Sequence, residues 1–274
     1  MQLSEIYSYP LKSAKGRMHS SIELRGRGLA GDRRWMLVDS QGRFITGRIL
    51  PQLVHLSADT DHSGGLLLSW RDGSRHDEPP PAKDAQRLSV RVWSDQLSAA
   101  LASGTAHRWI SDRLGREVRL VRMDSVSQRL TTDKLGYAPQ PVSFADAYPL
   151  LLCNDSSRID LEQSLGKPLG MARFRPNLVV SGAAAWAEDD WSVIRIGQLR
   201  FRVASACTRC VFTTVDPMRG ERDADGEPLG ILGRLRQRPE GVVFGVNLLA
   251  LTPPSASSNS LGCLKQGDSI ERLE

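Results

Sequence analysis

The chain has 274 residues, of which 40% are hydrophobic and 24% charged, a composition that suits one large or two modest globular domains. No window approaches the ~18 consecutive apolar residues of a membrane span, and the opening stretch MQLSEIYSYPLKSAKG lacks the apolar core of a secretory signal. These features predict a cytoplasmic protein that does not associate with membranes. The net charge of +5 is small and spread along the chain, so binding of a small anion explains it as well as binding of nucleic acid.

Short apolar or β-branched runs, separated by Gly, Pro, Asp or Ser, recur through almost the whole chain. They predict a mainly β protein with strands at residues 35–38, 66–70, 88–92, 118–121, 178–180 and 193–196. Gly197 and Gln198 join the last of these to a further run, 199–203, with the length and leading glycine of a type II′ hairpin turn. Sheets of this kind usually close or pack as barrels.

A few helices are expected between the strands, at residues 106–114, 156–165 and 227–236. Thr105 is placed to cap the first, Gly166 to stop the second, and Pro228 to open the third. Exposed loops are expected at residues 72–84 and 253–260, and a final strand is expected at 268–273. Because the first helix and the strand after it close a first unit, we expect two domains that share an interface, 1–122 and 123–274.

The segment ACTRCVFTTVDP, residues 206–217, concentrates thiols, a guanidinium and hydroxyls. Its cysteines, Cys207 and Cys210, allow four interpretations: a dithiol redox couple, half of a zinc site, one thiolate that ligates a soft metal, or two buried structural thiols. For the single thiolate, the neighbouring Arg209 would favour the charged form of the sulfur.

Other features of the sequence weigh on these interpretations. A redox couple normally opens a helix, whereas the β-branched run 211–215 predicts a strand. A zinc site needs further ligands, but Cys153 and Cys263 are single and distant, and the five histidines are isolated from one another. A single thiolate ligand is therefore the favoured interpretation, with buried structural thiols kept as the alternative.

Cationic and polar residues elsewhere suggest parts of the same site. Lys12 and Ser13 follow a turn fixed by proline, where an ammonium and a hydroxyl can meet a phosphate. Arg33 stands at the entrance of a predicted strand, and so do Arg175 and Asn177. Any one of these alone would be interpreted as a surface ion pair.

Taken in order, these segments resemble the MOSC-domain proteins of the amidoxime-reducing branch, the group that contains the mitochondrial amidoxime-reducing component and its bacterial relatives. The resemblance spans nearly the whole chain. It rests on seven blocks: YPLKSAKG at 9–16, GDRRWMLVD at 31–39, TGR at 46–48, FRPNLVVSG at 174–182, AEDDW at 187–191, CTRCVFTTVDP at 207–217 and FGVN at 244–247.

The resemblance implies a β-rich N-terminal MOSC_N domain packed on a MOSC β-barrel, with a molybdenum cofactor (Mo-molybdopterin) between them. The second cysteine of its C-x-R-C block, here Cys210, would be the metal ligand and the catalytic residue, with Cys207 a bystander. The implied cofactor-binding residues are Lys12, Ser13, Arg33, Arg175, Asn177, Thr208, Arg209, Thr214 and Asn247. Pyridoxal phosphate binding is a further label that the family as a whole carries.

The implied reaction is the two-electron reduction of small N-hydroxylated compounds, which breaks the N–O bond and releases water. The sequence has no run of cysteines spaced for an iron–sulfur cluster, so electrons are expected from a separate ferredoxin- or flavoprotein-like donor. Asp189, Asp190 and Asp216 are candidates for proton relay, but each is expected to be structural.

Two rival functions stay open. A sulfur or molybdenum-cofactor carrier would use Cys210 to hold a persulfide or the cofactor without turnover. A nucleic-acid-binding module would use basic residues such as Arg25, Arg27, Arg34 and the arginines of 234–238. It ranks last, because the aromatic residues are not interleaved with the basic ones, and no nucleic-acid partner is expected.

Overall fold

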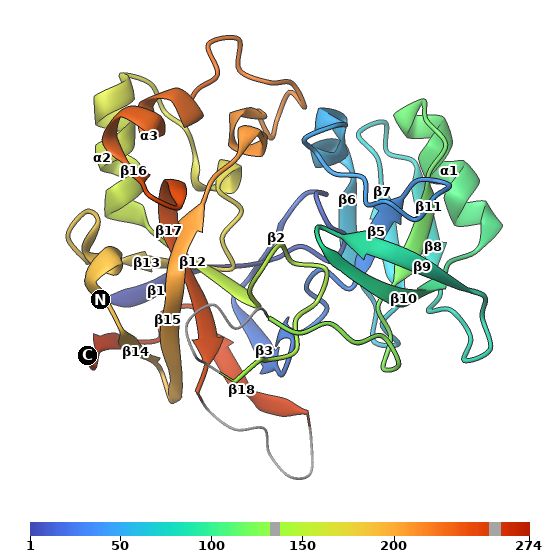
Figure 1. Cartoon of the computed structure of the whole chain (residues 1–274), viewed down its shortest axis with the longest axis horizontal. Coiled ribbons are helices and arrows are strands. Elements are labelled where there is room, and N and C mark those ends of the chain that lie inside the picture. Colours follow the sequence, from blue (N-terminus) through green and yellow to red (C-terminus); the bar gives the residue numbers. More distant parts are fainter. Residues whose placement is uncertain (132–137, 252–258) are drawn as a thin grey trace.

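The computed structural model describes residues 1–131, 138–251 and 259–274. Figure 1 shows two lobes, a larger one that holds both termini and a smaller one built from the first half of the chain. In the described residues the fold is mainly β with three α-helices, which confirms the predicted fold class. None of the helices in these residues is long and apolar enough to cross a membrane.

The larger lobe is organised around a nine-stranded sheet. Its order is β19-β14-β15-β17-β12-β13-β1-β2, with β16 paired to β17. The strands are β1 (Gln2–Ser8), β2 (Arg17–His19), β12 (Leu150–Asn154), β13 (Leu178–Ser181), β14 (Val193–Ile196), β15 (Leu199–Thr208), β16 (Gln237–Arg238), β17 (Gly241–Ala250) and β19 (Ile270–Arg272). A three-stranded sheet of the same lobe comprises β18 (Ser260–Lys265), β3 (Ser21–Arg25) and β4 (Gly28–Leu29).

The smaller lobe contains two of the described sheets together with an α-helix (Figure 1). The first has the order β5 (Trp35–Val38), β11 (Arg119–Arg122), β10 (Asp95–Leu101) and β9 (Arg87–Val92). The second comprises β6 (Ser57–Thr60), β7 (Leu66–Ser69) and β8 (Arg75–Glu78). Leu11, Trp35, Leu37, Ile110 and Leu120 belong to the core that the helix α1 (Gly104–Leu114) shares with these strands.

The two lobes share the first part of the chain. β1 pairs antiparallel with β13, so the N-terminus is hydrogen-bonded to strands of the second half. β3 likewise pairs with β18. The predicted boundary near residue 122 stays a prediction. Strands β1 to β4, between residues 2 and 29, pair within the two sheets of the larger lobe, while Leu11 and Lys15 form single bridges to Trp35 and Ser57 of the smaller lobe.

Local chemistry explains where the helices begin and end. In α1, the Ser103 hydroxyl accepts a hydrogen bond from the Ala106 N–H at 3.2 Å, so the cap is Ser103 and not the predicted Thr105. The helix α2 (Asp155–Leu165) ends at Gly166, which is left-handed at φ 75° as expected. The short helix α3 (Leu229–Leu235) begins after Pro228.

Two local predictions are wrong. The run 211–215, predicted as a strand, contains the 3₁₀ helix η4 (Val211–Thr214), because the hydroxyls of Thr213 and Thr214 donate to carbonyls three residues back, at 2.9 and 2.8 Å. Within the predicted loop 72–84, β8 pairs with β7, and its Glu78 is buried where it accepts hydrogen bonds from Ser103. The other 3₁₀ helices are η1 (Pro51–His55), η2 (Met171–Arg173) and η3 (Ala187–Asp190).

The remaining predicted strands are present, with ends that differ by a few residues at most. The β14–β15 hairpin turns at Gly197, whose φ of 55° fits the leading position of the predicted turn. The predicted loop 253–260 lies outside the described residues except for its last two positions, and Ser260 begins β18.

Replacement of Gly245 by alanine tests the closest approach within the large sheet. Gly245 has φ 73°, and a Cβ there would lie 2.6 Å from the Leu152 carbonyl oxygen and 2.8 Å from Cys153 Sγ. We expect Gly245→Ala to lower the free energy of unfolding by roughly 3 kcal/mol or more, from strain plus overlap. Urea denaturation measures this loss.

Gly226 supplies the matched control, because it has the same φ of 73° but nothing within 4 Å of an added Cβ. Gly226→Ala should cost only the backbone strain, about 1 kcal/mol. Equal losses of unfolding free energy in the two variants would show that the close approach of residue 245 to β12 does not affect stability.

Candidate active site

A polar cavity of about 160 Å³ lies where the two lobes meet. Nine of the ten predicted site residues line it: Lys12, Ser13, Arg33, Arg175, Asn177, Thr208, Arg209, Cys210 and Asn247. Thr214 does not; its hydroxyl is buried and donates to the Val211 carbonyl at 2.8 Å. Sequence reasoning missed further lining residues, among them Thr46, Arg48, Asp146 and Arg173.

Cys210 reaches this cavity from the end of β15. Thr208 is the last residue of that strand, and Cys210 is the extended residue that precedes η4, with φ −133° and ψ 177°. The 3₁₀ turn therefore follows the thiol and fixes its position against the cavity wall. Among the described residues, no group of three His, Cys, Asp or Glu side chains gathers that could hold a metal ion by itself.

Arg209 contacts the other thiol of the motif. Its Nη1 donates to Cys207 Sγ at 3.1 Å, and its Nη2 donates to the Phe174 carbonyl at 2.7 Å. Burial opposes the charge of Arg209, but the Cys207 sulfur and other thiols nearby raise its pKa. Cys207 also lines the cavity, so Arg209 orders this thiol while Cys210 stays available for a ligand.

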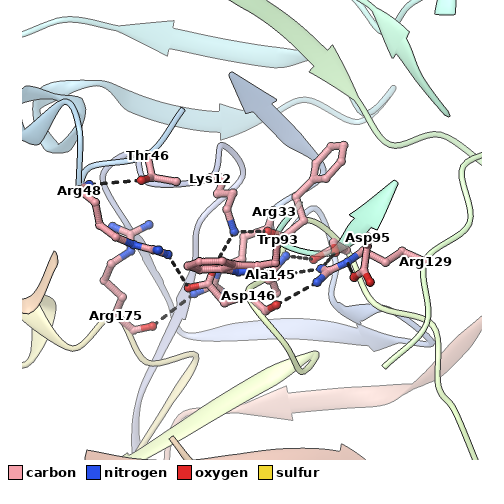
Figure 2. Close-up of polar contacts among 12 residues, drawn as sticks. Lys12, Arg33, Thr46, Arg48, Trp93, Asp95, Arg129, Ala145, Asp146 and Arg175 are labelled. Atoms are coloured by element: carbon pink, nitrogen blue, oxygen red, sulfur yellow. Dashed lines mark hydrogen bonds and ion pairs between the residues drawn. The ribbon is translucent and has the colours of Figure 1, made fainter. Parts of the chain in front are cut away.

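The buried Lys12 and the exposed Asp146 form an ion pair in the cavity lining (Figure 2). Lys12 Nζ donates to the Phe144 carbonyl and to Asp146 Oδ1, both at 2.6 Å. Desolvation lowers the pKa of Lys12, while the carboxylate opposes that shift. Desolvation would raise the pKa of Asp146, but Lys12 and then Arg48 hold it well below its usual range. The carboxylate is therefore charged, and 61% of its side chain is exposed for contact with a ligand.

Arg33 and Asn177 connect the two lobes behind the cavity. Arg33 Nη1 donates to Asp32 at 2.6 Å and to Asn177 Oδ1 at 3.1 Å. Asn177 is buried, and its amide also donates to the Tyr7 carbonyl at 3.1 Å and accepts from the Leu151 N–H at 3.2 Å. Asn177 thus links β1 to β12, and most of its hydrogen-bond donors and acceptors already have partners within the protein.

Arg175 lies between two rings. Its guanidinium carbon is 4.1 Å from the centroid of Tyr9 and 5.3 Å from that of Phe212, and Nη1 donates to the Ala14 carbonyl at 2.7 Å. Burial lowers the pKa of Arg175 to about 10. The rings of Tyr9 and Phe212 and the Ala14 carbonyl therefore hold the buried, desolvated guanidinium of Arg175 in place.

Four buried arginine nitrogens at this cavity have no hydrogen-bond partner among the described residues: Arg48 Nε, Arg173 Nε, Arg175 Nη2 and Arg209 Nε. An unsatisfied buried N–H costs free energy, so native structures usually supply an acceptor. An anionic ligand with several acceptor oxygens or sulfurs fits these donors.

Backbone strain also concentrates here. Of the five non-glycine residues with left-handed φ in the described chain, three line the cavity, namely Ser13 at 68°, Arg33 at 49° and Arg175 at 54°. Such conformations each cost of order 1 kcal/mol and persist where the surroundings enforce them, often at functional sites. The three aspartates considered as proton relays and expected to be structural, Asp189, Asp190 and Asp216, are not among the residues that line the cavity. Asp189 pairs with Arg236 and Arg238, and Asp216 pairs with Arg173 at 2.9 Å.

Fold and site together describe a two-lobed β protein with a cavity that several arginines and a thiol line. Comparison with known families agrees: residues 1–117 match the MOSC N-terminal beta barrel domain, and residues 139–271 match the MOSC domain. The chain therefore belongs to the MOSC-domain proteins, in the branch of the amidoxime-reducing components.

Curated relatives span nearly the whole chain. Mitochondrial amidoxime-reducing component 1 of Xenopus laevis is 29% identical over 99% of this chain and 82% of its own length. Mitochondrial amidoxime reducing component 2 of Rattus norvegicus is 31% identical over 99% and 83%. Molybdenum cofactor sulfurase of Oryza sativa subsp. japonica is 30% identical over 90% of this chain but only 32% of its own length. Among these three names, that of the sulfurase mentions the molybdenum cofactor. The pyridoxal phosphate label stays a prediction.

Inorganic phosphate tests the unpartnered arginine nitrogens. Added to the ligand-free protein, it should raise the thermal unfolding temperature, because it binds the folded state. At tenfold its Kd the gain is about 1.4 kcal/mol. In Arg175→Met at least half of this gain should disappear, as measured by scanning calorimetry. Potassium chloride at equal ionic strength controls for screening.

Arg238 provides the matched variant. It lies outside the cavity lining and pairs with Asp189 at 2.8 Å. Arg238→Met should keep the full response to phosphate. An equal loss in both variants would contradict an anion site at the cavity.

Proposed function

We propose that this protein is a molybdenum-cofactor-dependent oxidoreductase that reduces N-hydroxylated compounds. The observation that carries the proposal is the meeting of Cys210 with buried arginine nitrogens that lack acceptors in one cavity. Sulfur is a ligand that soft and redox-active metals select. The phosphate and dithiolene of the cofactor bring the acceptors that the arginines need.

The names of the relatives support the reaction class. An amidoxime carries an N–OH group, and the relatives are named for its reduction. The proposed reaction takes two electrons and two protons, breaks the N–O bond, and yields the N–H compound and water. When bound, the cofactor would supply the two-electron chemistry.

The residues of the chain would bind and orient. Cys210 would hold the metal, and the phosphate would meet Lys12, Ser13, Arg33, Arg175 and Asn177, with Thr208, Arg209 and Asn247 beside it. Arg175 and Arg209 would neutralise its charge. Asp146, charged and partly exposed at the same cavity, can accept hydrogen bonds from the N–H or O–H of a substrate.

Thr214 has a different part in this proposal. Because its hydroxyl is committed to the Val211 carbonyl, it would position the η4 turn after Cys210 and would not touch the cofactor. Electrons would come from a separate ferredoxin- or flavoprotein-like donor. A cytoplasmic location also stays a prediction.

A cofactor or sulfur carrier is the second candidate. It is favoured by the 30% identity to a molybdenum cofactor sulfurase, which aligns with 32% of that protein. A carrier would use the same cavity and Cys210, but would release its cargo and would not turn over N-hydroxylated compounds.

Metal and pterin content tests the proposal, in protein purified from a host that makes the cofactor. We expect near-stoichiometric molybdenum in the wild type and a loss of at least tenfold in Cys210→Ser, because a serine hydroxyl is a poor ligand for a soft metal. Elemental analysis and pterin fluorescence measure this. The loaded protein, reduced by a viologen dye, should then convert an amidoxime to an amidine.

Cys207→Ser is the matched control, because its hydroxyl can still accept from Arg209. It should keep its metal. Loading of the wild type without any turnover would favour the carrier, and no metal in any sample would remove the molybdenum proposal altogether.

A further inference from the structure

An exposed tryptophan lies in a strained turn next to the cavity. Val92 pairs with Asp95 across β9 and β10, so Trp93 and Ser94 form a two-residue turn. Trp93 has φ 56°, and 44% of it is exposed. Such a position favours glycine or asparagine, and a bulky residue there is strained. Turn formation alone therefore does not explain the tryptophan.

Two of the contacts of Trp93 are with residues that line the cavity. Its indole N–H donates to Asp146 Oδ1 at 3.3 Å, and the Arg48 guanidinium carbon lies 4.1 Å from the ring centroid. Phe44 packs edge-on against the indole, with centroids 5.3 Å apart. Asp146 and Arg48 both line the cavity, and Figure 2 shows the indole beside them. The turn between β9 and β10 in the smaller lobe thus contacts two residues of the cavity between the lobes.

These groups offer two kinds of contact to one ligand. The Asp146 carboxylate accepts hydrogen bonds from N–H and O–H groups, such as those of an amidoxime or amidine. Trp93 is 44% exposed next to that carboxylate, so part of an aromatic residue is accessible to the same ligand although Arg48 lies over its ring. A ligand with a planar ring joined directly to its amidine-type group can use both contacts at once.

We propose that Phe44, Arg48, Trp93 and Asp146 form a subsite at the mouth of the cavity that binds the aromatic ring of N-hydroxylated amidines. It favours such substrates over aliphatic ones with the same reacting group. This inference rests on the proposed reductase function, and it names the substrate class.

Kinetics on the loaded protein test the subsite, with benzamidoxime and acetamidoxime as the aromatic and aliphatic substrates and a reduced viologen as electron source. In Trp93→Asn we expect the KM for benzamidoxime to rise about three- to tenfold, the loss of one aromatic contact. The KM for acetamidoxime and both kcat values should stay within about twofold. Trp93→Phe keeps a ring and should lose less than Trp93→Asn.

Asparagine is chosen because it tolerates left-handed φ, so the variant should fold at least as stably as the wild type. Thermal unfolding and molybdenum content check this. Equal changes for the two substrates, or no change for either, would overturn the subsite.

Binding provides a readout that does not require turnover. Calorimetry should show that the loaded wild type binds benzamidine more tightly than acetamidine, and that Trp93→Asn loses this preference. If the wild type reduced neither amidoxime, the proposed function would fail, while the two binding constants would still decide the subsite. Equal affinity of the wild type for both amidines would refute it.

Discussion

Buried positive charge that the protein does not neutralise is the constraint around which the rest of the structure is arranged. Arg33 pairs with Asp32, Lys12 with Asp146 and Arg173 with Asp216. Within the described chain, Arg175 and Arg209 form no ion pair with a carboxylate, although both line the cavity. Burying a charge without a partner is expensive, so aromatic faces, carbonyls and a thiol hold these two guanidiniums only in part. The missing neutralisation is what an anionic cofactor would contribute, and it explains why the cavity is polar, strained and placed between the lobes.

That placement depends on the first strand. The Tyr7 N–H donates to the Asn177 carbonyl at 2.8 Å, which fixes β1 to the segment that carries Arg175. The Arg33 N–H donates to the Tyr9 carbonyl at 2.8 Å, and the Tyr9 N–H donates to Asp32 at 2.8 Å. The N-terminal segment is thus hydrogen-bonded on one side to the larger lobe and on the other to the start of β5. Residues far apart in the sequence meet because one strand is shared, and the same hydrogen bonds set the separation of the lobes at the cavity.

The sequence was informative where local pattern decides structure. Alternating apolar residues predicted β9 and β14, and glycines marked the hairpin at Gly197 and the end of α2. It failed where a few side chains override propensity, as when the threonine hydroxyls turn 211–214 into a 3₁₀ helix. Charged and polar blocks indicated Lys12, Ser13, Arg33, Arg175 and Asn177, since anion binding needs Lys, Arg and small polar side chains together. Thr208 and Asn247 followed only from the family resemblance. Asp146 and Trp93 could not be predicted, because their importance comes from one contact between distant segments, and a lone Asp or Trp carries no pattern.

The residues of the site fall into two groups that differ in exposure, and the difference bears on what the cavity does. Lys12, Ser13 and Asn177 are each no more than 5% exposed and are fixed by hydrogen bonds or strained backbone, as a permanently bound group requires. Trp93, which contacts the lining residues Asp146 and Arg48, is 44% exposed, and the side chain of Asp146 is 61% exposed. A cofactor carrier needs only the buried, fixed residues and an opening of the cavity to solvent. An enzyme also needs exposed groups that bind a substrate and release the product. The strained Trp93, hydrogen-bonded to the exposed carboxylate of Asp146, is such a group. The arrangement therefore favours turnover at this cavity over storage of a cofactor.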